Sequence, residues 1–161
     1  MKMSIIYHTR TGNTARMAEI VAQGMESVPG VEAKCFNIDR VNSGWLKDSQ
    51  CIVVGSPTYY ASISGELKVF LESMGKYDPA GKLGGAFATA NYIHGGGELA
   101  IQCILDHMLV YGMLVYSGGS SCGKPVIHLG PEAVNGKLQE VEDVFFTYGQ
   151  RMAKKATELF K

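Results

Sequence analysis

The sequence has no excess of charge of either sign. Its 161 residues include 15 lysines and arginines and 15 aspartates and glutamates, so the formal net charge at pH 7 is zero. Proteins that bind nucleic acid or an anionic membrane surface need a positive field, because lysine and arginine neutralise the phosphates. We therefore expect neither nucleic acid nor a membrane among the partners of this protein.

Long apolar runs are also absent. The nearest candidate, residues 108–116, contains Gly112 and is far shorter than the roughly 18 residues of a membrane span. The first apolar run, residues 3–8, is too short for a secretory segment and is followed directly by polar Thr9 and Arg10. These observations predict a soluble, cytoplasmic protein.

The four cysteines include no C-x-x-C pair, the spacing of many zinc sites and redox dithiols. Two of the cysteines fall inside apolar runs, which indicates reduced thiols in the core. Cys122 differs because it lies in a stretch rich in serine and glycine, and it is the one candidate for exposure. We expect no metal site.

What the sequence does contain is a regular alternation of strand-like and helix-like patterns. Short, nearly continuous apolar runs are typical of strands that are buried on both faces of a parallel sheet. Between these runs, apolar residues recur near helical spacing, and Ser64 is suited to be the N-cap of one helix. We expect strands at residues 3–8, 31–38, 50–55, 83–89 and 113–117, and helices at residues 13–28, 64–74, 98–111 and 137–160.

This alternation predicts an α/β fold, in which a parallel sheet of five strands has helices packed on both of its faces. The length favours a single domain over residues 1–161, because one hydrophobic core commonly serves about 150 residues. Residues 118–136 form the only long irregular stretch, and a loop of this length is more often functional than idle. Its length makes it a candidate lid, and the alternatives are that it contacts a partner or a neighbouring subunit, or that it is simply mobile.

The loop after the first expected strand is rich in hydroxyl groups and contains one glycine. Ligands of an open parallel sheet bind beyond the carboxyl ends of its strands, so this loop is a candidate site. Backbone N–H groups and hydroxyls at the start of a helix are suited to hold a phosphate group. The alternative is that the threonine and asparagine side chains only cap the helix. The loop consists of Thr9, Arg10, Thr11, Gly12, Asn13 and Thr14.

Two common phosphate-binding motifs are missing. There is no G-x-x-x-x-G-K-[ST], which disfavours a nucleoside triphosphatase, and no G-x-G-x-x-G after the first strand, which disfavours a dinucleotide-binding domain. A phosphorelay receiver, which shares this sheet topology, needs a carboxylate at the end of the third strand, where Gly55 and Ser56 stand. The loop at residues 9–14 therefore suits a monophosphate.

The loops after the third and fourth strands suit a flat ring. The third strand is followed by the adjacent aromatic residues Tyr59 and Tyr60, and a planar ligand needs stackable apolar walls. The alternative is that these tyrosines only plug the end of the sheet. In the next loop, three consecutive glycines at residues 95–97 indicate that the backbone approaches another group closely. His94 could contact a second substrate there, although an exposed loop histidine is the commoner case.

These loops resemble those of known flavoproteins. Residues 9–14 match in full the T-x-T-G-x-T phosphate loop that is the hallmark of the flavodoxin family. The segments G-S-P-T at residues 55–58 and G-G-G at residues 95–97 are similar to those of flavodoxin-like NAD(P)H:quinone oxidoreductases of the tryptophan-repressor-binding-protein type. One departure is Tyr111, which precedes Gly112 where that type often has a histidine. The resemblance implies a flavodoxin-like three-layer sandwich with the strand order 2-1-3-4-5.

The resemblance also implies that FMN is the cofactor. Its phosphate would lie against residues 9–14, and its ring would be held by the two later loops. The flavin itself supplies the redox chemistry, so no catalytic side chain is expected. The expected cofactor-binding residues are Thr9, Arg10, Thr11, Gly12, Asn13, Thr14, Pro57, Thr58, Tyr59, Tyr60, Thr89, Ala90, Asn91 and Gly95.

Two functions are compatible with this resemblance. The first is an FMN-dependent reductase that takes a hydride from NAD(P)H and reduces a quinone or a similar small acceptor. The alternative is a flavodoxin-type carrier of single electrons between redox proteins. Such carriers usually present an acidic face for docking, so the balanced charge of this chain modestly favours the reductase. A domain that kept the fold and lost the flavin is a third alternative, and a homo-oligomer is compatible with each of them.

Overall fold

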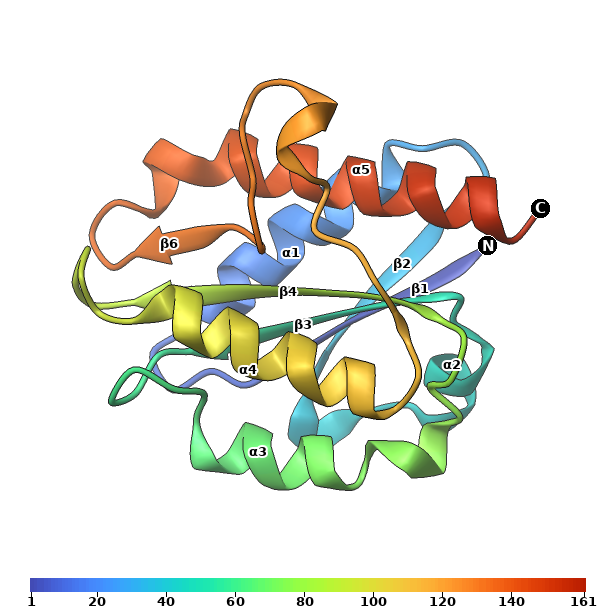
Figure 1. Ribbon diagram of the computed structural model, residues 1–161, viewed down its shortest axis with the longest axis horizontal. Helices are drawn as coiled ribbons and strands as arrows, with labels where there is room; N and C mark the ends of the chain where they lie inside the picture. Colours follow the sequence, from blue (N-terminus) through green and yellow to red (C-terminus); the bar gives the residue numbers. More distant parts are fainter.

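The fold is a parallel sheet with helices on both faces (Figure 1). The computed structural model describes residues 1–161, and its strands are β1 (Lys2–Tyr7), β2 (Glu32–Asn37), β3 (Cys51–Pro57), β4 (Leu83–Ala90), β5 (Leu114–Val115) and β6 (Glu132–Val134). The α-helices are α1 (Asn13–Glu26), α2 (Ser43–Asp48), α3 (Gly65–Glu72), α4 (Gly97–Val110) and α5 (Glu142–Leu159). The strands follow the order β2-β1-β3-β4-β5, as predicted, and β6 also pairs with β4.

Each face of the sheet carries its own hydrophobic core, because successive side chains of a strand point to opposite faces. Ile5 of β1 and Val53 of β3 pack with α1 and α5, where Tyr148 is fully buried. Their neighbours Ile6 and Val54 pack with α2, α3 and α4. Figure 1 shows α1 and α5 above the sheet and α3 and α4 below it. This arrangement confirms the predicted three-layer sandwich.

The fifth position of the sheet is filled by two short strands. β5 pairs with Leu83 and Gly84 near the start of β4, and β6 pairs with residues 88–90 at its end. The strand expected at residues 113–117 is therefore reduced to two residues, and the loop expected at residues 118–136 contains β6. Three residues are too few to show a strand period, so the sequence does not reveal β6.

Two helix starts show how local signals succeed or fail. Ser64 is the N-cap of α3, as predicted, because its hydroxyl accepts a hydrogen bond from Leu67 N at 3.4 Å. The sequence does not predict α2, because this helix has only six residues and buries only Leu46, so it shows no apolar period. None of the helices combines the length and the apolar character that a bilayer crossing requires.

The cysteines are all free thiols in different surroundings. Cys51 is fully buried, and burial raises its pKa. Cys35 and Cys103 are half-buried, and burial raises the pKa of Cys35 to about 12. Cys122 is exposed, which confirms the prediction that it is the accessible thiol.

Candidate functional site

A cleft lies at the carboxyl ends of β1, β3 and β4. The loops that follow these three strands are distant in sequence, and each contributes to the walls of the cleft. The lining residues are Arg10, Thr11, Asn13, Thr14, Pro57, Thr58, Tyr59, Thr89, Ala90 and Asn91. All ten belong to the predicted set of cofactor-binding residues. The other four, Thr9, Gly12, Tyr60 and Gly95, lie in the same loops but do not line the cleft.

The loop at residues 9–14 turns sharply into α1. Gly12 is the residue before the helix, and its φ of 93° lies in the left-handed region that favours glycine. The Gly12 N–H donates to Thr9 Oγ1 at 3.0 Å, and Arg16 N donates to Gly12 O at 3.0 Å. No side chain caps α1, so the alternative of a purely capping role for this loop is not supported. The uncapped N–H groups of the first turn form a positive end that suits an anion.

Three threonines connect the loops around the cleft. The hydroxyls of Thr14 and Thr89 are both buried and hydrogen-bond to each other at 2.9 Å. Thr58 N donates to Thr89 O at 2.8 Å, whereas the Thr58 hydroxyl is buried without any partner. A buried hydroxyl without a hydrogen bond is costly, and Thr58 lines the cleft. A ligand with phosphate or ring acceptor atoms would satisfy it, so these residues fit the FMN that the sequence predicts.

The loop after β3 forms a tight turn at residues 59–62. Tyr59 and Ser62 exchange two backbone hydrogen bonds of 2.9 and 3.0 Å, while Tyr60 and Ala61 have φ values of 48° and 58°. Positive φ is unfavourable for residues with a Cβ, and such strain is concentrated at functional sites. Gly96 approaches this turn so closely that a Cβ there would lie 2.7 Å from Ala61 Cα. The glycine triplet therefore makes the predicted close approach, and at Gly96 the group approached is the backbone of Ala61.

Arg10 reaches across the site and holds the side chain of Tyr59. The Arg10 guanidinium lies 4.5 Å from the centre of the Tyr59 ring, and Nη2 donates to Glu66 Oε1 at 2.8 Å. Hydrogen bonds from its own backbone N–H and from Arg10 lower the pKa of Glu66. The sequence points to Arg10 as a phosphate ligand, whereas in the structure its side chain is engaged by Tyr59 and Glu66.

Sequence reasoning missed two groups beside the cleft. The Asn13 side chain donates to Asn135 Oδ1 at 3.0 Å, and Asn135 N donates to Ala90 O at 2.8 Å, so Asn135 joins two of the site loops. Asn135-Gly136 is a turn signal, but it is hard to place without β6. Tyr92 and Ile93 are the second group: both are strongly exposed in the loop after β4.

Two carboxylates lie near the start of α4. Gly97, the first residue of that helix, leaves the space in which the Glu132 carboxyl packs, and a Cβ there would overlap it. Glu132 Oε1 is buried and has no hydrogen-bond partner. Burial is the main cause that raises the pKa of Glu132, and the nearby charge of Glu98 adds to it.

We expect Glu132→Gln to stabilise the protein at pH 7. The pKa of Glu132 is raised on folding, so the folded protein favours the protonated carboxyl. The stability that this carboxyl contributes is therefore fully present below the unfolded pKa of 4.5 and is lost as the pH rises through the folded pKa. The gain at pH 7 should be at most about 1 kcal/mol, since solvent screens a partly exposed carboxylate. Urea unfolding at pH 7 and at about pH 4 measures it, and the gain should be absent at the lower pH.

The exposed Glu140 provides the control, and Glu140→Gln should change neither unfolding midpoint. An equal gain for Glu132→Gln at both pH values would attribute the effect to packing and not to charge.

Comparisons with known proteins agree with this geometry. A model of the NADPH-dependent FMN reductase family matches residues 43–124. A flavodoxin from Clostridium saccharobutylicum is 44% identical over 161 residues, which cover 99% of this chain and 100% of that protein. The chain belongs to the flavodoxin family. This membership confirms the prediction of a flavodoxin-like FMN protein.

The chain is also similar to a quinone dehydrogenase and to a WrbA-like flavodoxin. An NAD(P)H dehydrogenase (quinone) from Solidesulfovibrio magneticus is 27% identical over 143 residues, covering 71% of this chain and 70% of that protein. The crystal structure of a flavodoxin, WrbA-like protein from Agrobacterium tumefaciens superimposes with a TM-score of 0.83 and 26% identity, covering 98% of both chains.

Proposed function

We propose that this protein binds FMN in the cleft and carries electrons between redox partners. The observation that supports the proposal most strongly is the convergence of ten predicted contact residues, from three loops, on one cleft at the carboxyl ends of the strands. Open parallel sheets bind their ligands at this edge. FMN, when bound, supplies the redox chemistry, and the protein binds it, orients it and limits its contact with water.

The phosphate would be held at residues 9–14, where the uncapped start of α1 offers backbone N–H groups. The Thr14 hydroxyl is already paired with Thr89, so it would position the loop more than bind the ligand. Thr58 has a free hydroxyl at the wall of the cleft and would donate to a ligand acceptor.

The ring would lie between the loops that follow β3 and β4. Tyr59 would flank it, with its own ring fixed by the guanidinium of Arg10. Ala90 and Asn91 would line the other side, and the backbone at Gly95 would border the ring edge. Because Arg10 contacts the Tyr59 ring and is itself held by Glu66, little side-chain freedom of Tyr59 would be lost on binding.

Large exposed apolar side chains follow the cleft-lining residues Tyr59 and Asn91 in two of the loops, which favours an electron carrier. Tyr60 is fully exposed, and Tyr92 and Ile93 are 74% and 65% exposed. Apolar side chains gathered on a surface mark places where partner proteins dock. A redox protein that covers these three side chains would approach the edge of the flavin ring directly.

A reductase of quinones or similar acceptors with NAD(P)H as donor is the second candidate. Two observations favour it: the zero net charge provides no acidic field to guide basic partners, and the matching family model is that of NADPH-dependent FMN reductases.

FMN binding is tested first by titrating the purified protein with FMN and with riboflavin, which lacks the phosphate. We expect a perturbed flavin absorbance band and a clearly lower Kd for FMN. An unperturbed flavin spectrum at micromolar concentrations would contradict both candidate functions.

The two functions are then separated with the FMN-loaded protein. A carrier should mediate the reduction of cytochrome c by a separate NADPH-dependent flavoprotein and should oxidise neither NADH nor NADPH by itself. Turnover of NADH or NADPH on addition of benzoquinone alone would contradict the carrier and support the reductase.

A further inference from the structure

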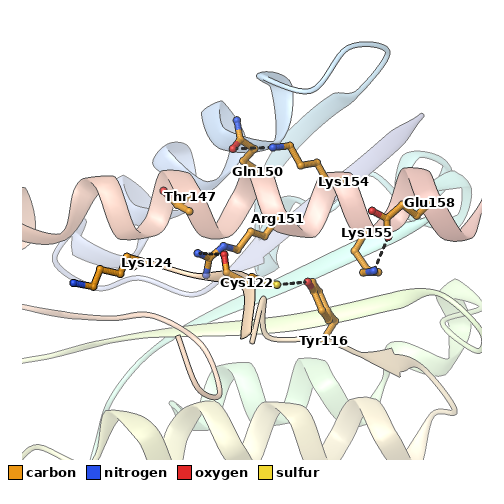
Figure 2. Close-up of a pocket in the computed structure, with 9 residues that line it drawn as sticks. All are labelled: Tyr116, Cys122, Lys124, Thr147, Gln150, Arg151, Lys154, Lys155 and Glu158. Carbon is orange, nitrogen blue, oxygen red and sulfur yellow. Dashed lines mark hydrogen bonds and ion pairs between the residues drawn. The ribbon is translucent and has the colours of Figure 1, made fainter. Parts of the chain in front are cut away.

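A second cavity lies far along α5 from the cleft, between that helix and the segment that follows β5 (Figure 2). Its volume is about 480 Å³, within the range of small-molecule sites. The lining residues are Tyr116, Cys122, Lys124, Thr147, Gln150, Arg151, Lys154, Lys155 and Glu158. None of them lines the FMN cleft.

The charge of this cavity contrasts with that of the chain. Four cations line it, and Glu158 is the only anion, although the whole chain has no net charge. Glu158 forms an ion pair with Lys155, whereas the Lys154 ammonium donates only to the neutral Gln150 side chain, at 3.2 Å. Like charges that are gathered without enough counter-charges repel each other, and a bound anion would remove that repulsion.

Arg151 connects the two segments that enclose the cavity. Its guanidinium donates to the carbonyl oxygens of Pro125, Cys122 and Gly123 at 2.9, 3.2 and 3.1 Å. These bonds attach the segment after β5 to α5 and keep the positive group in place. The ring of Tyr116 also lines the cavity, and its hydroxyl hydrogen-bonds with the Cys122 sulfur at 3.4 Å.

The positions of the cations indicate the shape of the ligand. Figure 2 shows Lys124 and Lys155 at opposite ends of the cavity, with Arg151 and Cys122 between them. A single small anion could contact only one end. We propose that this cavity binds a small polyanion, with two or more phosphate or carboxylate groups, at a site separate from the FMN cleft.

The binding can be followed at the cavity itself, because Cys122 is an exposed thiol in its wall. In the full-length protein saturated with FMN, the rate of Cys122 alkylation by neutral iodoacetamide is measured by peptide mass spectrometry. The probes are ADP, inorganic pyrophosphate and citrate, with chloride at equal ionic strength as reference. Cys51 is fully buried and serves as the unreactive internal standard.

We expect at least one of the three probes to slow the alkylation of Cys122 several-fold at submillimolar concentration, with a Kd that calorimetry confirms. Protection by ADP alone would identify a nucleotide site. Protection by ADP and also by pyrophosphate would identify a phosphate site, and protection by citrate would identify a carboxylate site. The double variant Lys124→Gln/Lys154→Gln should weaken binding by about tenfold, the loss of two charge contacts.

The matched control is Lys68→Gln/Lys76→Gln, which makes the same charge change on the opposite face of the sheet, in and after α3. It should change the Kd less than twofold and leave the alkylation rate unaltered. FMN titration of both variants verifies that they are folded. Equal losses in the two double variants would overturn the proposal, because only the net charge would then matter.

Two further outcomes would also overturn it. One is the absence of protection and of measurable binding at millimolar concentrations of all three probes. The other is protection by poly-glutamate and by none of the small anions, which would assign the surface to an acidic macromolecule.

Discussion

Replacing Gly149 by alanine should lower the free energy of unfolding by about 3 kcal/mol, as expected for an overpacked core that cannot relax. Gly149 lies on α5 where that helix crosses α1, and a Cβ there would overlap the carbonyl oxygen of Val21. On α1, a Cβ at Gly24 would overlap the carbonyl oxygen of Phe146 in the same way. Backbone atoms cannot rotate out of the way as a side chain can, so the two helices would have to separate.

The displacement of α1 in Gly149→Ala should extend to the candidate site, because α1 begins at the loop of residues 9–14. Urea unfolding followed by circular dichroism measures the loss of stability. FMN titration at a urea concentration where the variant is still folded measures the displacement of the loop.

Gly65→Ala is the matched control for the glycine replacement. Gly65 is helical, in α3, and a Cβ there would meet no atom within 4 Å. We expect an unchanged or slightly higher stability, by less than about 1 kcal/mol, because alanine favours helices more than glycine does. Similar stabilities of Gly149→Ala and Gly65→Ala would show that α1 and α5 can separate without cost.

The sheet and the four long helices could be predicted because their signals are long and local. The first four strands have apolar residues on both faces, as in Cys51–Pro57, and their observed limits differ by at most two residues from those expected. The elements that were missed are short. β6 has three residues, and its position depends on pairing with β4, which is distant in the sequence.

The positions of the loops at the candidate site could be predicted, but the contacts between them could not. The loops at residues 9–14, 57–60 and 89–91 follow strands, so the sheet topology alone brings them together. The contacts between loops could not be predicted, because they join distant segments. Asn13 meets Asn135 across 122 positions, and Arg10 meets Glu66 across 56. The sequence predicts a close approach at the glycine triplet but not its partners, which are Ala61 at Gly96 and Glu132 at Gly97.

Replacing Gly12 by alanine should reduce the affinity for FMN at least about tenfold, an energy of about 1.4 kcal/mol. At φ 93°, Gly12 turns the chain into α1, whose first residues Asn13 and Thr14 line the cleft and whose first N–H groups would hold the phosphate. A Cβ would meet no atom within 4 Å, so the strain comes from the backbone dihedral and not from a clash. The chain relieves this strain by rotating away from positive φ, which turns those N–H groups away from the phosphate.

Gly30→Ala separates this local effect from a general loss of stability. Gly30 has a φ of 80° and also has no atom within 4 Å of an added Cβ, but it precedes β2, at the opposite end of the sheet from the cleft. Both variants should therefore lose about 1–2 kcal/mol of stability, and only Gly12→Ala should bind FMN more weakly. Riboflavin has no phosphate, so its weaker binding should be the same in both variants and in the unmodified protein. If Gly12→Ala weakened riboflavin and FMN equally, the loop would be shaping the ring pocket and the phosphate would have to lie elsewhere.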